Sequence, residues 1–257
     1  MQKKKILIKI GTNVITKEGG KLDLGVIKHI AEQVATIRNR GYEVILVTSG
    51  AVGAGRVLFK KNNKEETIID KQVYAAVGQV SLINTYTKYF KKYKVGCAQV
   101  LVTREDFRDK VHYENMENCF LNVLKRNVLP IVNENDIVAI KELLFTDNDE
   151  LMSLVALQLK VDIVIILSSV EGLISGDPKD KNAKIINEVG IKDFKKIGKY
   201  ITKDKTSLGK GGMISKFAMT KKLVKDGVIV YIANGKRKNV ITDIIVGKKV
   251  GTRFTPK

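Results

Sequence analysis

Four segments of the chain end in glycine or in polar side chains that a buried strand does not need. They are residues 6–12, 44–51, 130–136 and 209–216, and their ends carry lysine, glycine, serine, asparagine and aspartate. In an open α/β sheet, ligands bind beside the carboxyl ends of the strands. Cationic, small and amide groups at these ends predict a site for a small anionic substrate and a phosphate donor, and therefore an enzyme.

Lys9 is the sharpest single signal. It lies in the apolar run 6–10, two residues before Gly11. Burying a lysine is costly unless an anion meets it, so this position favours a phosphate at the end of the strand. The alternative is an edge strand with Lys9 in water. For Lys9 alone the two interpretations carry equal weight.

Two glycine-rich segments could approach an anion closely. Residues 48–55 follow a strand-like run and offer backbone N–H groups beside the Ser49 hydroxyl. Residues 209–212 precede a helical pattern, and Lys216 lies about one turn inside it, so its ammonium can reach back to the helix N-terminus. An ordinary tight turn and a flexible loop with a surface lysine are the alternatives. Neither the P-loop nor the dinucleotide fingerprint occurs.

Two further clusters carry carboxylates and amides, Asn-Glu-Asn-Asp at 133–136 and Thr-Asp-Asn-Asp at 146–149. Helix capping and turn formation explain each of them singly. Two clusters at element ends favour function, because such groups can bind a substrate ammonium and orient Mg²⁺ around phosphates. His29 and His112 lie far from these ends in the sequence, and we interpret both as ordinary surface or packing residues.

The composition, 44% hydrophobic and 28% charged, is that of a soluble globular protein. The 257 residues include 46 Lys+Arg against 27 Asp+Glu, a net charge of +19, which raises a nucleic-acid hypothesis. Binding of nucleic acid would need clustered basic residues with exposed aromatics. The lysines are scattered and tryptophan is absent, so we interpret most lysines as solvated and expect no nucleic-acid partner.

Cys97 and Cys119 lack the spacing of a metal motif, and we expect both to be small, reduced core residues. Lys9 and Gly11 interrupt the N-terminal apolar run, which argues against a signal peptide. No apolar stretch approaches the length of a membrane span. We therefore expect a cytoplasmic protein without a membrane partner.

Strand-like and helix-like patterns alternate almost from end to end. We expect strands at 6–10, 44–47, 95–102, 128–132, 161–167 and finally 228–232, and helices at 26–37, 72–93, 113–126, 151–159 and 213–226. A hairpin over 138–145 and a mobile surface excursion over 179–210 complete the chain. Buried β-branched runs between amphipathic helices predict a three-layer α/β protein with a mainly parallel sheet, in one domain.

Taken in order, these motifs resemble the amino-acid kinase family, and within it the branch that acts on glutamate. The matching runs cover nearly the whole chain: residues 9–12, 47–51, 75–79, 101–106, 130–136, 147–149, 171–173 with Asp177 and Pro178, and 211–213 with Lys216. The runs at 133–136 and 147–149 together with Gly-Gly-Met-x-x-Lys are typical of that branch. Kinases of acetylglutamate, aspartate, carbamate or UMP should share Lys9 and the glycine loops but lack the run at 133–136.

The resemblance implies an αβα sandwich whose N-terminal part binds the amino acid and whose C-terminal part, from about residue 160, binds ATP. It implies that ATP, with Mg²⁺, phosphorylates the γ-carboxylate of L-glutamate to give L-glutamyl 5-phosphate, the first step of proline biosynthesis. This carboxylate is already ionised at neutral pH, so no general base is needed. Feedback inhibition by proline and a homo-oligomer, a dimer or tetramer, are further implications.

Position by position, the resemblance implies that Lys9 and Lys216 neutralise the transferring phosphoryl group and that Asp149 organises them. The implied glutamate-binding residues are Ser49, Asn133, Asp136, Asp147 and Asn148. The implied ATP-binding residues are Lys9, Gly11, Ser168, Ser169, Lys210, Gly211, Gly212, Met213, Ile214, Ser215 and Lys216. No residue is assigned as a metal ligand.

The chain departs from the family in three places. Ser168 and Ser169 stand where Thr-Asp is usual, which removes a carboxylate from the nucleotide side, and Lys210 stands where the family usually has threonine in Gly-Thr-Gly-Gly. Many members also carry a C-terminal PUA domain. Since the chain ends at Lys257, we expect the short form without it.

Overall fold

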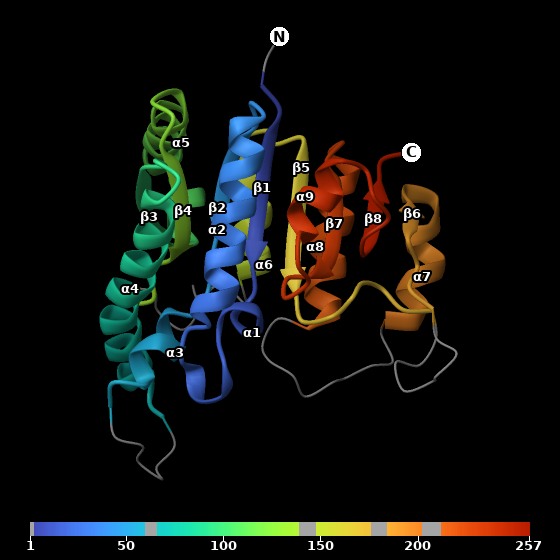
Figure 1. The fold of residues 1–257 in the computed structure, drawn as a ribbon. Coiled ribbons are helices and arrows are strands. Elements are labelled where there is room, and N and C mark those ends of the chain that lie inside the picture. The colour runs from blue at the N-terminus through green and yellow to red at the C-terminus, as the bar shows by residue number, and fades with distance from the viewer. Residues whose placement is uncertain (1–2, 60–65, 139–147, 176–183, 202–211) are drawn as a thin grey trace.

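The computed structural model describes residues 3–59, 66–138, 148–175, 184–201 and 212–257 (Figure 1). Their strands form one sheet in the order β3-β4-β2-β1-β5-β7-β8-β6. The strands are β1 (Lys5–Ile10), β2 (Glu43–Val47), β3 (Cys97–Val102), β4 (Leu129–Glu134), β5 (Ile163–Ser168), β6 (Glu188–Gly190), β7 (Ile229–Asn234) and β8 (Thr252–Thr255). The first six in spatial order run parallel, whereas β8 is antiparallel to β7 and parallel to β6. The mainly parallel sheet is confirmed.

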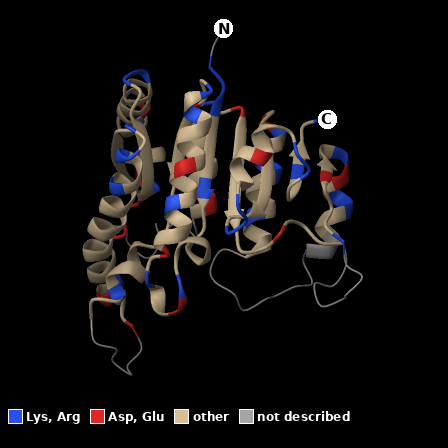
Figure 2. Ribbon diagram, in the orientation of Figure 1, with Lys and Arg blue, Asp and Glu red and all other residues tan. Residues whose placement is uncertain are grey.

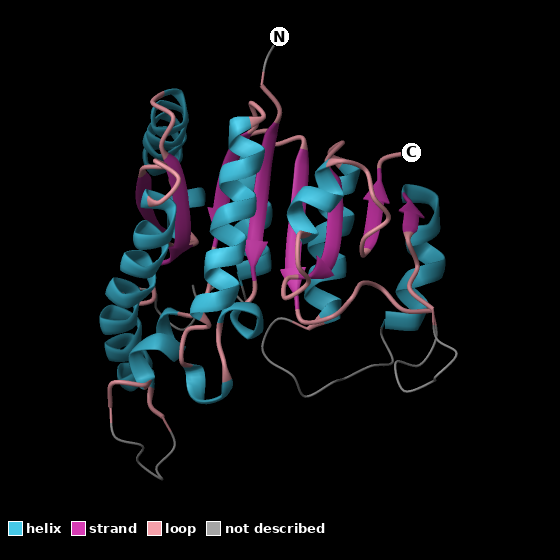
Figure 3. Ribbon diagram, viewed as in Figure 1, coloured by secondary structure: helices cyan, strands magenta, loops and turns pink. Residues whose placement is uncertain are grey.

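Helices cover both faces of the sheet (Figure 3). One hydrophobic core joins one face to α1 (Thr12–Ile15), α2 (Leu24–Asn39), α3 (Ala51–Arg56), α4 (Ile68–Lys91) and α9 (Val240–Ile245). A second core joins the other face to α5 (Lys110–Lys125), α6 (Asn148–Gln158), α7 (Phe194–Ile201) and α8 (Met213–Lys225). Single-turn helices occur at Glu18–Gly20, Glu105–Phe107 and Ile191–Asp193. The three-layer αβα sandwich expected from the sequence is confirmed.

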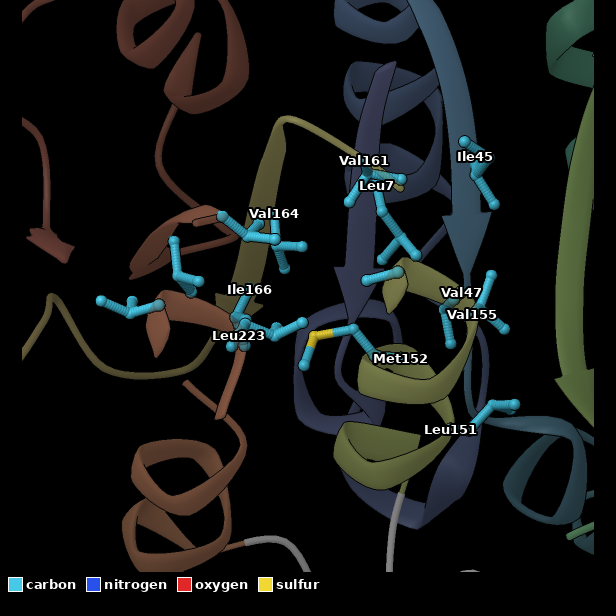
Figure 4. Close-up of a cluster of buried hydrophobic side chains, with 14 of the residues drawn as sticks. Leu7, Ile45, Val47, Leu151, Met152, Val155, Val161, Val164, Ile166 and Leu223 are labelled. Atoms are coloured by element: carbon cyan, nitrogen blue, oxygen red, sulfur yellow. The ribbon is translucent and has the colours of Figure 1, made fainter. Parts of the chain in front are cut away.

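Alternation along β1 decides which layer each of its side chains meets. Ile6, Ile8 and Ile10 belong to the core with α2, while Leu7 belongs to the core with α6. Figure 4 shows Leu7 and Met152 of α6 among the side chains of that second core. Because side chains two residues apart share a face of a strand, Lys9 points to the α6 side as Leu7 does.

The structure differs from the sequence-based prediction in the C-terminal half. The strand expected at 228–232 is β7, but α9 and β8 follow it, so it is not the last strand. The described part of 179–210 contains β6 and α7, and Phe194 and Ile197 of α7 are buried in the core. The expectation of a mere surface excursion there is wrong, because Lys195 and Lys196 mask an amphipathic helix. Most of the hairpin expected at 138–145 lies outside the described residues.

The surface carries charges of both signs and one exposed cysteine. Lysine and arginine are distributed over helices, strands and loops, with acidic residues among them (Figure 2). Cys97 is half-buried, and burial raises the pKa of its thiol to about 11. Cys119 is exposed on α5, so its assignment to the core is wrong. Among the described helices, none combines the length and apolarity that crossing a membrane requires.

Candidate active site

One buried carboxylate lies between two buried lysines. The Asp149 Oδ1 atom accepts a hydrogen bond from Lys9 Nζ at 2.5 Å, and Asp149 Oδ2 accepts one from Lys216 Nζ at 3.0 Å. Asp149 is fully buried, and Lys9 and Lys216 are 4% and 7% exposed. Three residues that the resemblance assigns to phosphoryl transfer therefore meet at one point.

Three different elements bring these side chains together. Lys9 lies near the carboxyl end of β1, a central strand paired with β2 and β5. Asp149 is the second residue of α6, and Lys216 lies in the first turn of α8. The alternative of an edge strand with Lys9 in water is wrong, because β1 is central and Lys9 is buried. The site lies at the carboxyl end of β1, where α/β sheets bind their ligands.

The cluster combines two ammonium groups with one carboxylate in a region that water hardly reaches. Ammonium groups in low dielectric attract an anion strongly. The cluster therefore has the chemistry to bind a phosphoryl group and to stabilise negative charge that builds up on it.

Amide groups form a second cluster beside the first. Asn148, adjacent to Asp149 in the chain, donates from Nδ2 to the Thr48 carbonyl at 2.5 Å, to Ser49 Oγ at 2.8 Å and to Asn133 Oδ1 at 2.9 Å. Asn133 at the end of β4 donates from Nδ2 to Gln79 Oε1 at 2.9 Å. Ser49, Asn133 and Asn148, which the resemblance assigns to the amino acid, are thus hydrogen-bonded together.

The turn after β2 explains how Ser49 reaches this cluster. Gly50 has a φ of +99°, which favours glycine, and it turns the chain from β2 directly into α3. Gly78 of α4 packs against that turn so closely that a Cβ atom would lie 1.9 Å from the Ala51 carbonyl oxygen. Glycines at these two positions allow α3 and α4 to meet beside Ser49.

Asp136 is half-buried after β4. Burial raises the pKa of its carboxyl group to about 6, because desolvation disfavours the charged form. Such a carboxylate is suited to a ligand ammonium group, which would supply the missing positive charge. Asp147, the other acidic residue assigned to the amino acid, lies outside the described residues.

The residues assigned to the nucleotide lie around the start of α8 and the end of β5. Gly212 is the N-cap of α8 and has no side chain to cap it, and the N–H groups of Met213, Ile214 and Ser215 lie in the first turn of the helix. Ser168 is buried at the end of β5 and Ser169 is exposed. Lys210 and Gly211 lie outside the described residues.

Gly11 lies where the end of β1 meets the end of β5. Its N–H donates to the Leu167 carbonyl at 3.0 Å, and a Cβ atom would lie 3.3 Å from that same oxygen. This N–H is therefore occupied. Because Gly11 has no side chain, the ends of β1 and β5 can lie close together beside Lys9.

Comparison with known proteins agrees with this geometry. Residues 4–234 match the model of the Amino acid kinase family. A glutamate 5-kinase of Chlorobaculum tepidum is 46% identical over 253 residues, which are 98% of this chain and 69% of that protein. A glutamate 5-kinase of Clostridium tetani is 41% identical over 260 residues, with 98% and 94% covered. The chain belongs to the amino acid kinase family, among the glutamate 5-kinases.

Solved structures show the same fold at low sequence identity. The Giardia lamblia carbamate kinase bound to AMP-PNP superimposes with a TM-score of 0.72 at 16% identity, over 98% of each chain. The Bacillus anthracis UMP kinase gives a TM-score of 0.67 at 15% identity, over 98% of this chain and 96% of that one. At such identities these structures support the amino acid kinase fold alone.

Two residues that support the site, Gln79 and Arg104, were given no role from the sequence. Gln79 ends the amide cluster on α4, and Arg104, just after β3, forms an ion pair with Glu150. Asn148, Asp149 and Glu150 are consecutive, so the Arg104 pair ties the start of α6 to the segment that follows β3. Both residues belong to motif runs that carry the resemblance, at 75–79 and 101–106, but the runs alone do not reveal these partners.

Proposed function

We propose that this chain transfers the γ-phosphoryl group of ATP to the γ-carboxylate of L-glutamate, giving L-glutamyl 5-phosphate and ADP, the first step of proline biosynthesis. One observation carries the proposal. Asn148 and Asp149 are consecutive residues of α6, and one belongs to the amide cluster while the other binds both lysines. An amino acid held by the amides would therefore have its side chain beside the positive cluster.

The chemistry requires positioning and charge stabilisation more than proton transfer. The γ-carboxylate is ionised at neutral pH and can attack phosphorus directly. Lys9 and Lys216 would offset the charge on the equatorial phosphoryl oxygens and on the leaving oxygen of ADP. Asp149 holds the two ammonium groups apart and in place before the substrates arrive, so little reorganisation accompanies transfer.

The two substrates would divide the site between them. Ser49, Asn133, Asp136, Asn148 and the neighbouring Asp147 are the proposed glutamate side. The proposed ATP side is the part from about residue 160 onward, namely Ser168, Ser169 and the segment 210–216, completed by Gly11. The whole described chain would then act as one kinase domain, since one sheet carries both sides.

Mg²⁺ would enter with ATP. This ion is usually bound through phosphate oxygens and water with one or two carboxylates. In the part of the chain that the structure describes, no three histidine, cysteine or acidic side chains gather as metal ligands, and both Asp149 oxygens accept from lysines. The charge of a nucleotide-bound Mg²⁺ would add to that of the lysines.

The decisive experiment is ADP release with Mg-ATP and a panel of acceptors. L-Glutamate should be turned over, whereas aspartate, N-acetylglutamate, carbamate and UMP should not. Hydroxylamine trapping of the acyl phosphate would identify the product as a γ-glutamyl derivative. Turnover of any other acceptor in preference to glutamate would refute the proposal.

Proline would act as a feedback inhibitor at the same groups. It carries an α-carboxylate and a charged amine like those of glutamate, but it has no second carboxylate to phosphorylate. Inhibition should therefore be competitive with glutamate and noncompetitive with ATP. Inhibition patterns at varied concentrations of the two substrates test this directly.

The homo-oligomer would form through the exposed face of α4, with a second copy of the chain as the partner. Ile69, Val73, Val77 and Val80 are exposed on this helix. Residues 72–87 contain no charged side chain, although 28% of the whole chain is charged. Exposed apolar faces of this kind mark protein–protein interfaces.

A further inference from the structure

Gln79 is a buried polar residue that neither the sequence motifs nor the mechanism above gives a role. It is 9% exposed and lies on the face of α4 that is turned to the sheet. Its neighbour Gly78 allows α4 to contact the start of α3, immediately after Ser49 and Gly50. Gln79 is therefore held against the carboxyl ends of β2 and β4, inside the candidate site.

The orientation of the amides follows from one backbone group. The Thr48 carbonyl can only accept hydrogen bonds, so the atom of Asn148 that lies 2.5 Å from it must be the nitrogen. That nitrogen also faces Asn133 at 2.9 Å, so Asn133 presents its oxygen to Asn148 and its nitrogen to Gln79. Gln79 must in turn present its oxygen to Asn133. Every amide in the series is thereby oriented.

In this arrangement the Gln79 amide nitrogen takes no part in the hydrogen-bonded series of amides. Its oxygen accepts from Asn133, and no hydrogen bond from its two N–H groups is found among the residues that the structure describes. The residue is 9% exposed and lies next to the amide cluster, so this nitrogen is placed to donate to an acceptor that a ligand supplies.

We infer that Gln79 binds the α-carboxylate of the amino-acid substrate and sets the preference for a free acid at that position. This inference rests on the function proposed above. The γ-carboxylate must lie at Lys9 and Lys216, beside Asp149. Gln79 is separated from Asp149 by Asn148 and Asn133, which places it at the opposite end of the cluster. The carboxylate at that end of a bound glutamate is the α-carboxylate.

Ser49 and Asp136 supply the remaining groups that an α-amino acid would need. The Ser49 hydroxyl accepts from Asn148, so its own hydrogen is free to donate to the same carboxylate. Asp136 carries the acceptors that an ammonium group needs. Donors for the carboxylate and acceptors for the ammonium group together describe a site for a zwitterionic α-amino acid.

The test exchanges donors for an acceptor without changing shape. Gln79→Glu keeps an oxygen toward Asn133 and replaces the two N–H groups by a carboxylate oxygen. The KM for L-glutamate should rise roughly 10- to 100-fold, the loss expected for a hydrogen bond to a charged group. The KM for ATP should stay the same. With the α-carboxamide of glutamate, whose amide can donate to Glu, the variant should lose far less, so the preference for the acid over the amide should fall at least tenfold.

Gln33 provides a matched control. It is also buried, but its oxygen accepts from the Ile241 N–H at 2.8 Å and its nitrogen donates to the His29 carbonyl at 3.1 Å, so both ends of the amide are used within the fold. Gln33→Glu should lower stability and leave the KM for glutamate and the acid-to-amide preference unchanged. If Gln79→Glu behaves as Gln33→Glu does, Gln79 is structural and the inference is wrong.

A second variant and a binding measurement complete the design. Gln79→Met removes both the N–H groups and the oxygen that accepts from Asn133, without adding charge. It is used if the Glu variant folds poorly, and it too should raise the KM for glutamate selectively. Glutamate alone should raise the melting temperature of the natural protein, and less so that of either variant. An unchanged KM in Gln79→Met overturns the inference. Absence of glutamate turnover by the natural protein would instead overturn the proposed function.

Discussion

Lys9 and Lys216 donate to opposite oxygens of the Asp149 carboxylate, at 2.5 and 3.0 Å, although 140 and 67 residues separate them from it in the chain. One lysine comes from a central strand and the other from a helix of the α6–α8 layer. A single carboxylate thus sets the distance between two ammonium groups. Both ammonium groups are in place before any substrate binds.

Replacing either lysine by alanine should therefore abolish most of the turnover. Removing one preorganised group that stabilises the transition state costs roughly 10²–10³ in kcat, and we expect at least that for Lys9→Ala and for Lys216→Ala. Lys216→Arg should recover little, because a planar guanidinium cannot replace a compact ammonium. Lys28→Ala, on the exposed side of α2, is the control. Near-normal turnover in either alanine variant would remove that lysine from the mechanism.

Asp149→Asn tests the charge balance through stability. The variant keeps the shape but leaves two buried ammonium groups without their carboxylate, and breaking a buried pair in this way costs roughly 3–5 kcal/mol. Urea unfolding should show this loss. The matched control is Asp243→Asn, which breaks the surface pair with Lys248 at 2.7 Å and should cost at most about 1 kcal/mol. Equal losses in the two variants would contradict the buried-pair account.

The strands and long helices were predictable because their side chains repeat regularly. The run at 6–10 gave β1 within one residue, and α2, α4 and α5 were recognised from the helical period. In α7 the pattern failed, because Phe194 and Ile197 reach the core from a short, lysine-rich stretch. Periodicity is weak evidence in an element of two turns.

Sequence could name the site residues but not their partners. Lys9 indicated an anion through the cost of burying it, yet nothing in the local sequence shows that Asp149 meets it. The role of Gln79 depends on how α4 packs against β4, through residues 54 positions apart. Such contacts are set by the tertiary fold, and only the resemblance to a family could have suggested them beforehand.

The pH dependence of glutamate binding should follow Asp136. Burial raises its pKa to about 6, above its usual value of 3.8, and only the ionised form attracts the substrate ammonium. Below pH 6, kcat/KM for glutamate should therefore fall up to about tenfold per pH unit. Asp136→Asn should have a low kcat/KM without this dependence. An unchanged acid limb in the variant would assign the titration to another group.

The raised pKa of Asp136 should favour glutamate binding and folding stability at opposite ends of the pH range. Because the folded state holds the Asp136 proton more tightly than the unfolded state, this group lowers stability as the pH rises from about 4 to 6. Asp136→Asn should remove this loss. At pH 7 the variant should be more stable than the natural protein to urea while binding glutamate more weakly. A variant that is less stable at pH 7 would contradict this assignment.

The exposed face of α4 carries a stripe of apolar side chains. Ile69, Val73, Val77 and Val80 are between 37% and 70% exposed. Asp70 and Lys88 flank this stripe, and 18 residues, five helical turns, place them on one side of the helix. If two copies pack α4 antiparallel about a two-fold axis, Asp70 of each copy faces Lys88 of the other, and the valines meet between these pairs.

Val77→Asp would put like charges at the centre of this interface and should convert the oligomer to a smaller species in sedimentation velocity. Val111→Asp, at a valine of α5 that is 62% exposed, is the control and should leave the sedimentation coefficient unchanged. Lys88→Asp should weaken association as well, since it sets a carboxylate against Asp70 of the second copy. An oligomer that survives both α4 variants would assign the interface to another face of the molecule.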